Sequence, residues 1–147
     1  MQKKIKLLFL SLITAMFMIL PVCAEGSNTY RVVDQANLLT DQEEQSLNTK
    51  LREISERQQV DIAIMTVNSI PEGYSVRGYA DTVYEDSGYG YGANKDGLML
   101  LISMEDHDWY ITTMGYGITA FTDAGIQYIG DQITTDLAAK SYAKAFE

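Results

Sequence analysis

The sequence predicts an α/β fold, a three-layer α-β-α sandwich built on a small mixed sheet. Apolar patterns alternate along the chain in the order helix, strand, helix, strand, strand, helix, which is typical of layered α/β domains. The last two strands, 97–103 and 108–114, are joined only by a short polar connection, so they must pair as an antiparallel hairpin. The sequence contains no internal repeat and is long enough for one domain with a modest core.

Residues 1–24 are predicted to be a secretory signal peptide. Three lysines precede an almost uninterrupted apolar run, Leu7–Leu20, and Ala24 supplies a small residue at the expected cleavage site. The run is short for a membrane span, although an uncleaved anchor is an alternative. Lipidation of Cys23 is a second alternative, which Val22 disfavours because a small residue is required directly before the cysteine. We expect a secreted or extracytoplasmic protein whose mature domain is 25–147.

The mature chain is expected to be strongly acidic. It carries 8 basic and 20 acidic residues, a net charge of −12, against −9 for the whole sequence. This balance argues against nucleic acid and anionic lipid as partners and favours cations.

Several classes of enzyme are excluded by composition. Cys23 is the only cysteine and is lost on cleavage, so disulfides, thiol phosphatases and thiol proteases are excluded. His107 is the only histidine, which excludes two-histidine phosphatases and HExxH zinc sites. A Ser-His-Asp triad would have to use His107, and the sequence has no GxSxG elbow.

The first predicted helix covers residues 41–58. It follows an apolar segment, 32–39, that has no helical period. Thr40 and Glu43 form a capping box, the side-chain pair that satisfies the first free backbone amides of a helix. The next apolar residues repeat at spacings of four and three, which gives the helix one buried stripe. They are Leu47, Leu51 and Ile54.

A buried strand, residues 60–67, and a second helix follow. The strand is rich in β-branched residues, and Pro71 and Gly73 mark the turn after it. Asp61 is either a site residue or a solvent-facing residue at the strand edge, and we favour the edge. The second helix begins after Ser75, with Tyr79 and Tyr84 flanking its inner face. That face is predicted to consist of Val76, Ala80 and Val83.

A stretch rich in glycine and tyrosine, residues 87–97, ends the second helix. Its glycines follow a helix and precede a strand, so neither a Rossmann fingerprint nor a Walker loop fits, and no helix start is offered to a phosphate. An EF-hand counted from Asp86 fails on its acidic spacing. The tyrosines are either exposed on a mobile loop or part of a ligand-facing surface, and we favour the first interpretation.

The hairpin and a third helix complete the fold. Trp109 and Tyr110 are expected on opposite faces of the sheet, and His107 in a solvated turn at the hairpin tip. The third helix begins near Thr122, and its buried side is predicted to consist of Ile126, Ile129, Ile133 and Leu137. Residues 143–147 look like a fourth amphipathic element interrupted in its first turn, so we expect the sequence to be a piece of a longer chain.

The hairpin predicts where two carboxylates meet. Antiparallel pairing places Asp96 beside Gly115-Tyr116-Gly117 and, a few residues on, near Asp123. Carboxylates and backbone carbonyls on loops with little side-chain bulk are what calcium requires. The alternative is that Asp96 belongs to a turn and Asp123 caps a helix. The glycines expected to support this site are Gly90, Gly92, Gly97, Gly115 and Gly117.

Four motifs in order resemble the TPM domain family. They are Val33-Asp34-Gln35-Ala36-Asn37-Leu38-Leu39, a Tyr-Ala helix, the Gly-x-Gly stretch with Lys95-Asp96-Gly97 and the apolar strand after it, and Gly115-Tyr116-Gly117 with Phe121-Thr122-Asp123. Two departures are a longer glycine-tyrosine approach to Lys95 and Asn37 in place of a glycine. The resemblance, from about Val32 onward, implies an α-β-α sandwich in an extracytoplasmic domain. Bacterial relatives often add a membrane helix and a glycine-rich tail, so a tether is expected if the chain continues past Glu147.

The resemblance also carries functional expectations. Some family members bind calcium, and plant thylakoid members are linked to acid phosphatase activity and photosystem repair. It adds Asp34 to the expected metal ligands, which become Asp34, Asp96 and Asp123. Our leading hypothesis is a binding or assembly module that holds a divalent cation and contacts another cell-surface or membrane protein. One alternative is a metal-dependent phosphatase with Asp96 and Asp123 as catalytic candidates, and another is an interaction domain without metal.

Overall fold

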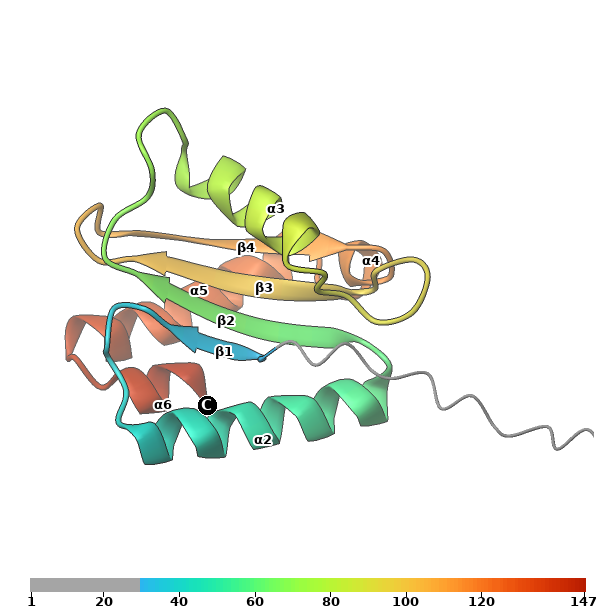
Figure 1. Cartoon of the computed structure of the whole chain (residues 1–147), viewed down its shortest axis with the longest axis horizontal. Coiled ribbons are helices and arrows are strands. Elements are labelled where there is room, and N and C mark those ends of the chain that lie inside the picture. The colour runs from blue at the N-terminus through green and yellow to red at the C-terminus, as the bar shows by residue number, and fades with distance from the viewer. Residues whose placement is uncertain (1–29) are drawn as a thin grey trace, which may run out of the picture.

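The computed structural model describes residues 30–147 and confirms the predicted α/β sandwich. Four strands form one mixed sheet in the order β1-β2-β3-β4, as Figure 1 shows. The first three strands are parallel and the fourth is antiparallel to the third. The strands are β1 (Val32–Asp34), β2 (Asp61–Val67), β3 (Gly97–Ser103) and β4 (Asp108–Met114). The predicted signal peptide lies outside the described residues.

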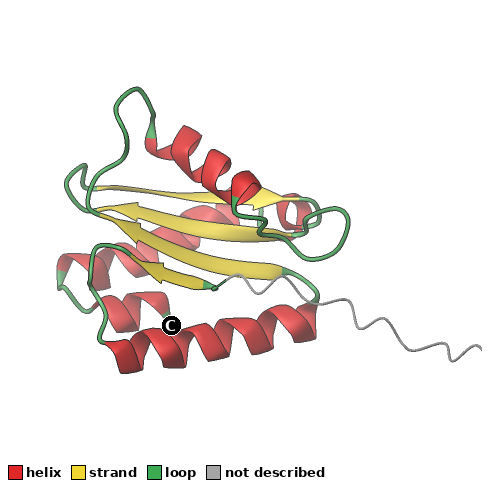
Figure 2. Cartoon of the chain, viewed as in Figure 1, coloured by secondary structure: helices red, strands yellow, loops and turns green. Residues whose placement is uncertain are grey.

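Helices cover both faces of the sheet (Figure 2). One face packs on α2 (Asp41–Gln58), α5 (Asp123–Ala138) and α6 (Tyr142–Phe146), and their apolar side chains share one core cluster with the sheet. The opposite face packs on α3 (Val76–Asp86) and forms a second cluster. A short helix, α4 (Gly117–Ala120), follows β4. None of the helices within residues 30–147 has the length and apolar character needed to cross a membrane.

Two elements have no counterpart among the predicted ones. The strand β1 is only three residues long, and Val32 pairs with Ile64 of β2. Helix α4 has four residues and lies between two turns. Both are too short for a hydrophobic period to be recognised, because a helix or strand pattern needs several repeats.

The predicted start of α2 is confirmed. The Glu43 amide donates to Thr40 Oγ1 at 3.3 Å, and the Thr40 amide donates to the Glu43 carboxylate at 2.8 Å. The helix ends at Gln59, whose φ of 55° is left-handed. The predicted range 41–58 is therefore correct at both ends.

The inner face of α3 differs from the prediction. Its buried residues are Val76, Ala80 and Tyr84, and Val83 is only partly buried. A spacing of four residues keeps these three side chains on one stripe, and Tyr84 can be buried because its hydroxyl donates to the Lys95 carbonyl oxygen at 3.0 Å.

The buried side of α5 is narrower than predicted. Only Gly130 and Ile133 are fully buried, whereas the other predicted residues, Ile126, Ile129 and Leu137, are partly buried or at the edge of the core. The indole ring of Trp109 lies directly against Gly130, where an added Cβ would stand 2.4 Å from it. Trp109 and Tyr110 pack on opposite faces, as predicted.

The hairpin tip is tied to the loop after β2 through Asp106. Its Oδ2 atom accepts hydrogen bonds from Ser103 Oγ at 2.5 Å and from the Ile70 amide at 3.3 Å. These bonds, that from Ser103 above all, lower the pKa of the Asp106 carboxyl group below its usual value of 3.8. His107 is exposed with a φ of 50°, in agreement with the predicted solvated turn.

We expect Asp106 to make part of the stability dependent on pH. A carboxyl group whose pKa is lower in the folded state stabilises the fold above its unfolded pKa, and this contribution is lost as the pH falls through the folded pKa. Urea denaturation should therefore show Asp106→Asn less stable than wild type at about pH 6, with a smaller difference at about pH 3. An equal difference at both pH values would contradict this account.

Candidate functional site

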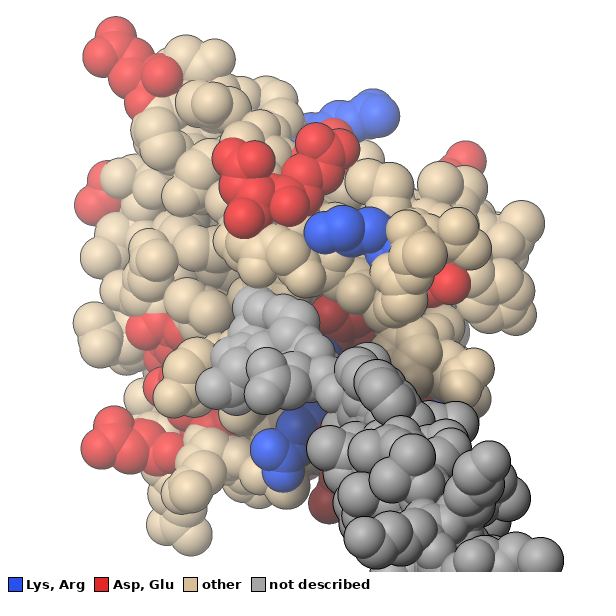
Figure 3. Space-filling model, turned by 45° about the vertical axis from the view of Figure 1, so that its right-hand side comes forward, with Lys and Arg blue, Asp and Glu red and all other residues tan. Residues whose placement is uncertain are grey.

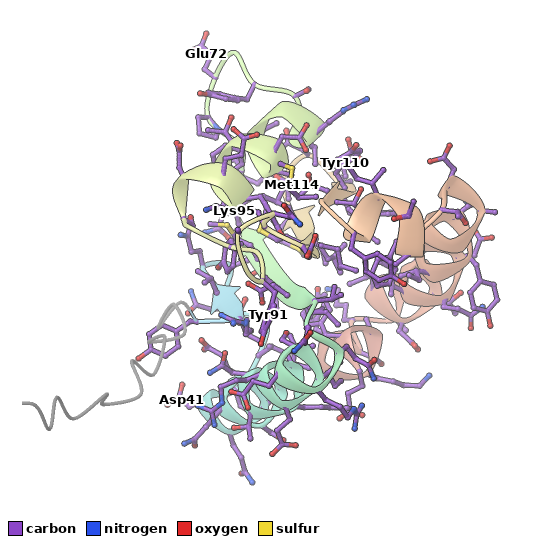
Figure 4. All side chains as sticks on the ribbon, turned by 90° about the vertical axis from the view of Figure 1, so that its right-hand side faces the viewer. Asp41, Glu72, Tyr91, Lys95, Tyr110 and Met114 are labelled. Atoms are coloured by element: carbon purple, nitrogen blue, oxygen red, sulfur yellow. The ribbon has the colours of Figure 1, made fainter. Side chains whose placement is uncertain are left out.

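The sheet brings Asp96 and the turn after β4 together, as the hairpin predicts. Gly97 pairs with Met114, so the residues before β3 lie beside those after β4. The Tyr116 amide donates to Asp96 Oδ1 at 2.6 Å. Figure 4 faces this end of the sheet, which we call the Asp96 end: residues 88–97 and 115–118.

Four of the five predicted supporting glycines allow close approach at the Asp96 end, and three of them, Gly97, Gly115 and Gly117, do so between different segments of the chain. A Cβ on Gly115, whose φ is 56°, would stand 2.2 Å from Asp96 Oδ1, and one on Gly117 would stand 2.1 Å from the Gly97 carbonyl oxygen. A Cβ on Gly97 would stand 2.6 Å from the Asp61 carbonyl oxygen. Each distance is far shorter than a carbon–oxygen contact allows, so larger residues would separate these segments.

The loop before β3 is a closed, hydrogen-bonded turn. Tyr91 and Asp96 exchange two backbone hydrogen bonds, of 2.9 and 3.0 Å, and the Lys95 amide donates to the Gly92 carbonyl oxygen at 3.3 Å. Gly90 packs against Lys95, where a Cβ would stand 2.5 Å from Cα, whereas Gly92 has open space around it. These backbone hydrogen bonds close the loop and stabilise it as a turn.

Asp61 is buried, and its predicted place at a solvent-facing edge was wrong. Only 3% of the residue is exposed. Its Oδ1 atom lies 2.6 Å from Arg31 Nε, and its Oδ2 atom accepts from the Gly90 amide at 2.9 Å. A buried carboxylate requires such partners. Asp61 is the first residue of its strand, a position at which an aspartate is usually exposed, so nothing in the sequence indicates that it is buried and paired.

Two buried tyrosines surround the same carboxylate. Burial, followed by the negative charge of Asp61, raises the pKa of both Tyr84 and Tyr89 above the usual value for a phenol. Both phenols are therefore neutral and act as hydrogen-bond donors. Tyr84 donates to the Lys95 carbonyl oxygen at 3.0 Å, and Tyr89 donates to that of Tyr30 at 3.1 Å.

Asp34 lies at the opposite end of the sheet. It pairs with Thr66 near the end of β2, whereas Asp61 at the start of β2 pairs with Gly97. Figure 1 shows the two ends on opposite sides. Asp34 accepts hydrogen bonds from the Leu39 amide at 2.7 Å and from the Thr66 hydroxyl, so it closes the connection between β1 and α2.

Asp123 is the first residue of α5. The helix cap is Thr122, whose hydroxyl accepts from the Gly125 amide at 3.3 Å, so the alternative of Asp123 as the cap was wrong. Its carboxylate lies in the first turn, where negative charge is favourable. The three predicted aspartates do not converge, and among residues 30–147 no group of three His, Cys, Asp or Glu is placed to hold a metal.

Large apolar side chains are exposed at the Asp96 end. Tyr91 is 37% exposed, and Tyr116 and Ile118 are each 60% exposed. The backbones of Tyr91 and Tyr116 are both hydrogen-bonded to Asp96, and the Ile118 amide donates to the Gly115 carbonyl oxygen at 3.2 Å. Figure 4 shows Tyr91 and Lys95 on this loop. Acidic side chains are spread over the neighbouring surface (Figure 3).

A cavity of about 330 Å³ lies elsewhere, between the start of α2 and α6. Its lining includes Leu39, Thr40, Glu43 and Ala143 but none of the predicted site residues. The residues of the Asp96 end therefore do not line this cavity.

Comparisons with known proteins support a common fold. The family model described as TPM domain matches residues 32–147. The N-terminal domain of a protein from P. gingivalis is 26% identical with a TM-score of 0.67, over 80% of this chain and 74% of that one. The N-terminal domain of a Corynebacterium glutamicum protein is 17% identical with a TM-score of 0.61, over 84% of this chain and 78% of that one. The BA42 protein of Bizionia argentinensis is 16% identical with a TM-score of 0.59, over 74% of this chain and 73% of that one. No curated protein matches the chain.

Proposed function

The chain belongs to the TPM domain family, and we propose that it is the binding module of an extracytoplasmic protein, with the Asp96 end as its binding surface. The observation that carries this proposal is the exposure of Tyr91 on the loop before β3 and of Tyr116 and Ile118 at the start of α4, two segments that Asp96 joins. Exposed apolar groups gathered in one place are typical of interaction sites. Tyrosine is also enriched where proteins bind one another.

The rigidity of this surface supports the proposal. The loop that carries Tyr91 is closed by its own backbone hydrogen bonds, and the turn that carries Tyr116 packs on Asp96 without space for a Cβ at Gly115. A side chain presented on a fixed backbone loses less entropy on binding than one on a mobile loop. The tyrosines therefore fit the ligand-facing interpretation better than that of a mobile loop.

The proposed partner is another cell-surface or membrane protein. A signal peptide at residues 1–24 would place the domain outside the cytoplasm, where such a partner is available. The mature net charge of −12 would repel acidic partners and attract basic ones.

Replacing the exposed side chains tests the proposal. The variant Tyr91→Ser/Tyr116→Ser/Ile118→Ser removes apolar surface that is already exposed, so the fold should be retained. We expect it to lose proteins that copurify with the wild-type domain from the envelope fraction of its own cell. The matched control is Tyr74→Ser/Tyr128→Ser, which removes two tyrosines exposed elsewhere. If the control loses the same proteins, or if the triple variant retains them, the Asp96 end is not the binding surface.

Divalent cation binding is a second part of the proposal. Asp96 supplies a carboxylate, and the Asn94 carbonyl oxygen lies against the same Gly115 turn, where an added Cβ would stand 2.7 Å from it. These oxygens fit calcium as a partial ligand set, because calcium accepts carbonyl oxygens and water together with carboxylates. Asp34 cannot contribute from the other end of the sheet. We therefore propose a weak calcium site in which the protein supplies few of the ligands.

A calcium titration followed by amide NMR tests the cation site. We expect resonances of residues 94–97 and 115–117 to shift with a dissociation constant of about 0.1 to 1 mM, as in extracellular modules. The shifts should disappear in Asp96→Asn and persist in Glu72→Gln, which changes an exposed acid in the distant loop after β2. The proposal of a cation at Asp96 is wrong if calcium causes no shifts in wild type, or if the same shifts occur in Asp96→Asn.

Phosphatase activity is a prediction from the family resemblance alone. Metal-assisted hydrolysis needs an ion held firmly enough to activate water. Hydrolysis of a generic phosphomonoester that is lost in Asp96→Ala, and retained in Glu72→Gln, would favour this alternative.

A further inference from the structure

The buried ion pair between Arg31 and Asp61 lies beneath the loop that carries Tyr91. We infer that Asp61 is the positioning residue of this loop, and that Arg31, just before β1, belongs to the same unit. This inference deepens the proposed function and rests on it for its functional meaning. The geometry that carries it is independent of any partner.

Asp61 is placed where a charge is costly unless it is paired. The residue is 3% exposed, and the side chain of Arg31 is 13% exposed. The separation of 2.6 Å between Nε and Oδ1 makes a charge-assisted contact. Removal of either member would take the charged partner from a side chain that has little access to solvent, so we expect the two residues to act as one unit.

Asp61 holds the loop at both of its ends. Its Oδ2 atom accepts from the Gly90 amide at 2.9 Å, near the start of the loop. Its own amide donates to the Asp96 carbonyl oxygen at 2.9 Å, at the end of the loop. One residue at the start of a central strand therefore sets the separation of the two loop ends.

Arg31 connects this unit to the rest of the fold. Its carbonyl oxygen accepts from the Ile64 amide at 2.7 Å, and its amide donates to Asn48 Oδ1 of α2 at 2.7 Å. Next to it, Tyr30 accepts a hydrogen bond from the Tyr89 hydroxyl at 3.1 Å. The segment before β1 is therefore bonded to the loop directly through Tyr89 and indirectly through Asp61, and we expect changes at Arg31 to alter the loop.

Amide hydrogen exchange of the free protein tests the inference. In Asp61→Ala we expect exchange at Gly90 to become at least about tenfold faster, because its amide loses the carboxylate that accepts its hydrogen bond. Exchange at Tyr91, whose amide donates to the Asp96 carbonyl oxygen, should also accelerate as the loop loosens. Exchange in the middle of β2 and β3, at Met65 and Leu100, should change far less. The control Asp106→Asn, which loosens the opposite end of the sheet, should leave Gly90 unchanged.

A double variant separates positioning from general stability. In Arg31→Met/Asp61→Asn both charges are removed, yet the amide oxygen at position 61 can still accept from Gly90. We expect the exchange of Gly90 to remain within about threefold of wild type, because the acceptor is kept. This variant also serves as the test if Asp61→Ala does not fold.

Two results would overturn the inference. One is an equal acceleration at Gly90 and Leu100 in Asp61→Ala, which would make Asp61 a residue of general stability. The other is exchange at Gly90 in the double variant as fast as in an unprotected loop. Both exchange measurements are made on the free protein, so they test the positioning role of Asp61 alone. The proposed function is tested separately by the copurification experiment with the serine variants.

Discussion

Gly117→Ala is expected to lower the free energy of unfolding by about 3 kcal/mol, the upper part of the usual range for overpacking. The added methyl group would stand 2.1 Å from the Gly97 carbonyl oxygen and 3.0 Å from the carbonyl carbon. Both atoms belong to backbone at the start of β3, which cannot move without disturbing its pairing with β2 and β4. The strain should therefore move α4 away from the sheet and open the Asp96 end.

Urea denaturation measures this effect, and Gly125→Ala is its matched control. A Cβ on Gly125 would make an ordinary contact, 3.6 Å from Thr122 Oγ1, within the first turn of α5. The control should change stability by less than about 1 kcal/mol and in the stabilising direction, because alanine favours a helix more than glycine does. Equal effects of the two substitutions would show that the close approach at Gly117 is not required.

Asp34→Ala is expected to lower the free energy of unfolding by about 2 kcal/mol, since it leaves one buried and one partly buried donor without their acceptor. The donors are the Leu39 amide and the hydroxyl of Thr66, a residue with no exposed surface. The loss should be the same in calcium and in a chelator, because Asp34 closes its own loop.

The calcium dependence separates the two roles of Asp34. A metal ligand would show a loss of stability mainly when calcium is present, since bound metal stabilises only the folded state. Glu72→Ala, an exposed acid, serves as the control and should change stability by less than about 0.5 kcal/mol. A loss confined to calcium-containing buffer would restore Asp34 to the metal site.

The features that sequence reasoning predicted correctly depend on neighbouring residues. The capping box of Thr40 and Glu43 needs only four positions. Asp96 lies beside the Gly115 turn because the connection between β3 and β4 is so short that the two strands can pair only as an antiparallel hairpin. In both cases chain connectivity determines the geometry, and a correct reading of the local pattern is sufficient.

The features that were missed depend on contacts between segments that are far apart in the sequence. The separation of Asp34 from Asp96 is set by the pairing of β1 and β3 with β2, and long connections leave that pairing undetermined by local sequence. The burial of Asp61 depends on Arg31, thirty positions earlier, and on Gly90 in a third segment. Family resemblance grouped the three aspartates, whereas Asp34 closes a turn at the opposite end of the sheet.

Site-specific photo-cross-linking in the producing cell tests the central claim most directly. A photoreactive amino acid would replace Tyr116 or Ile118 at the Asp96 end, and Tyr128 on α5 would be the equally exposed control, with 66% of its surface accessible. We predict a discrete cross-linked product from positions 116 and 118 and none from position 128. A product from position 128 alone, or the same products from all three, would contradict the Asp96 end as the binding surface.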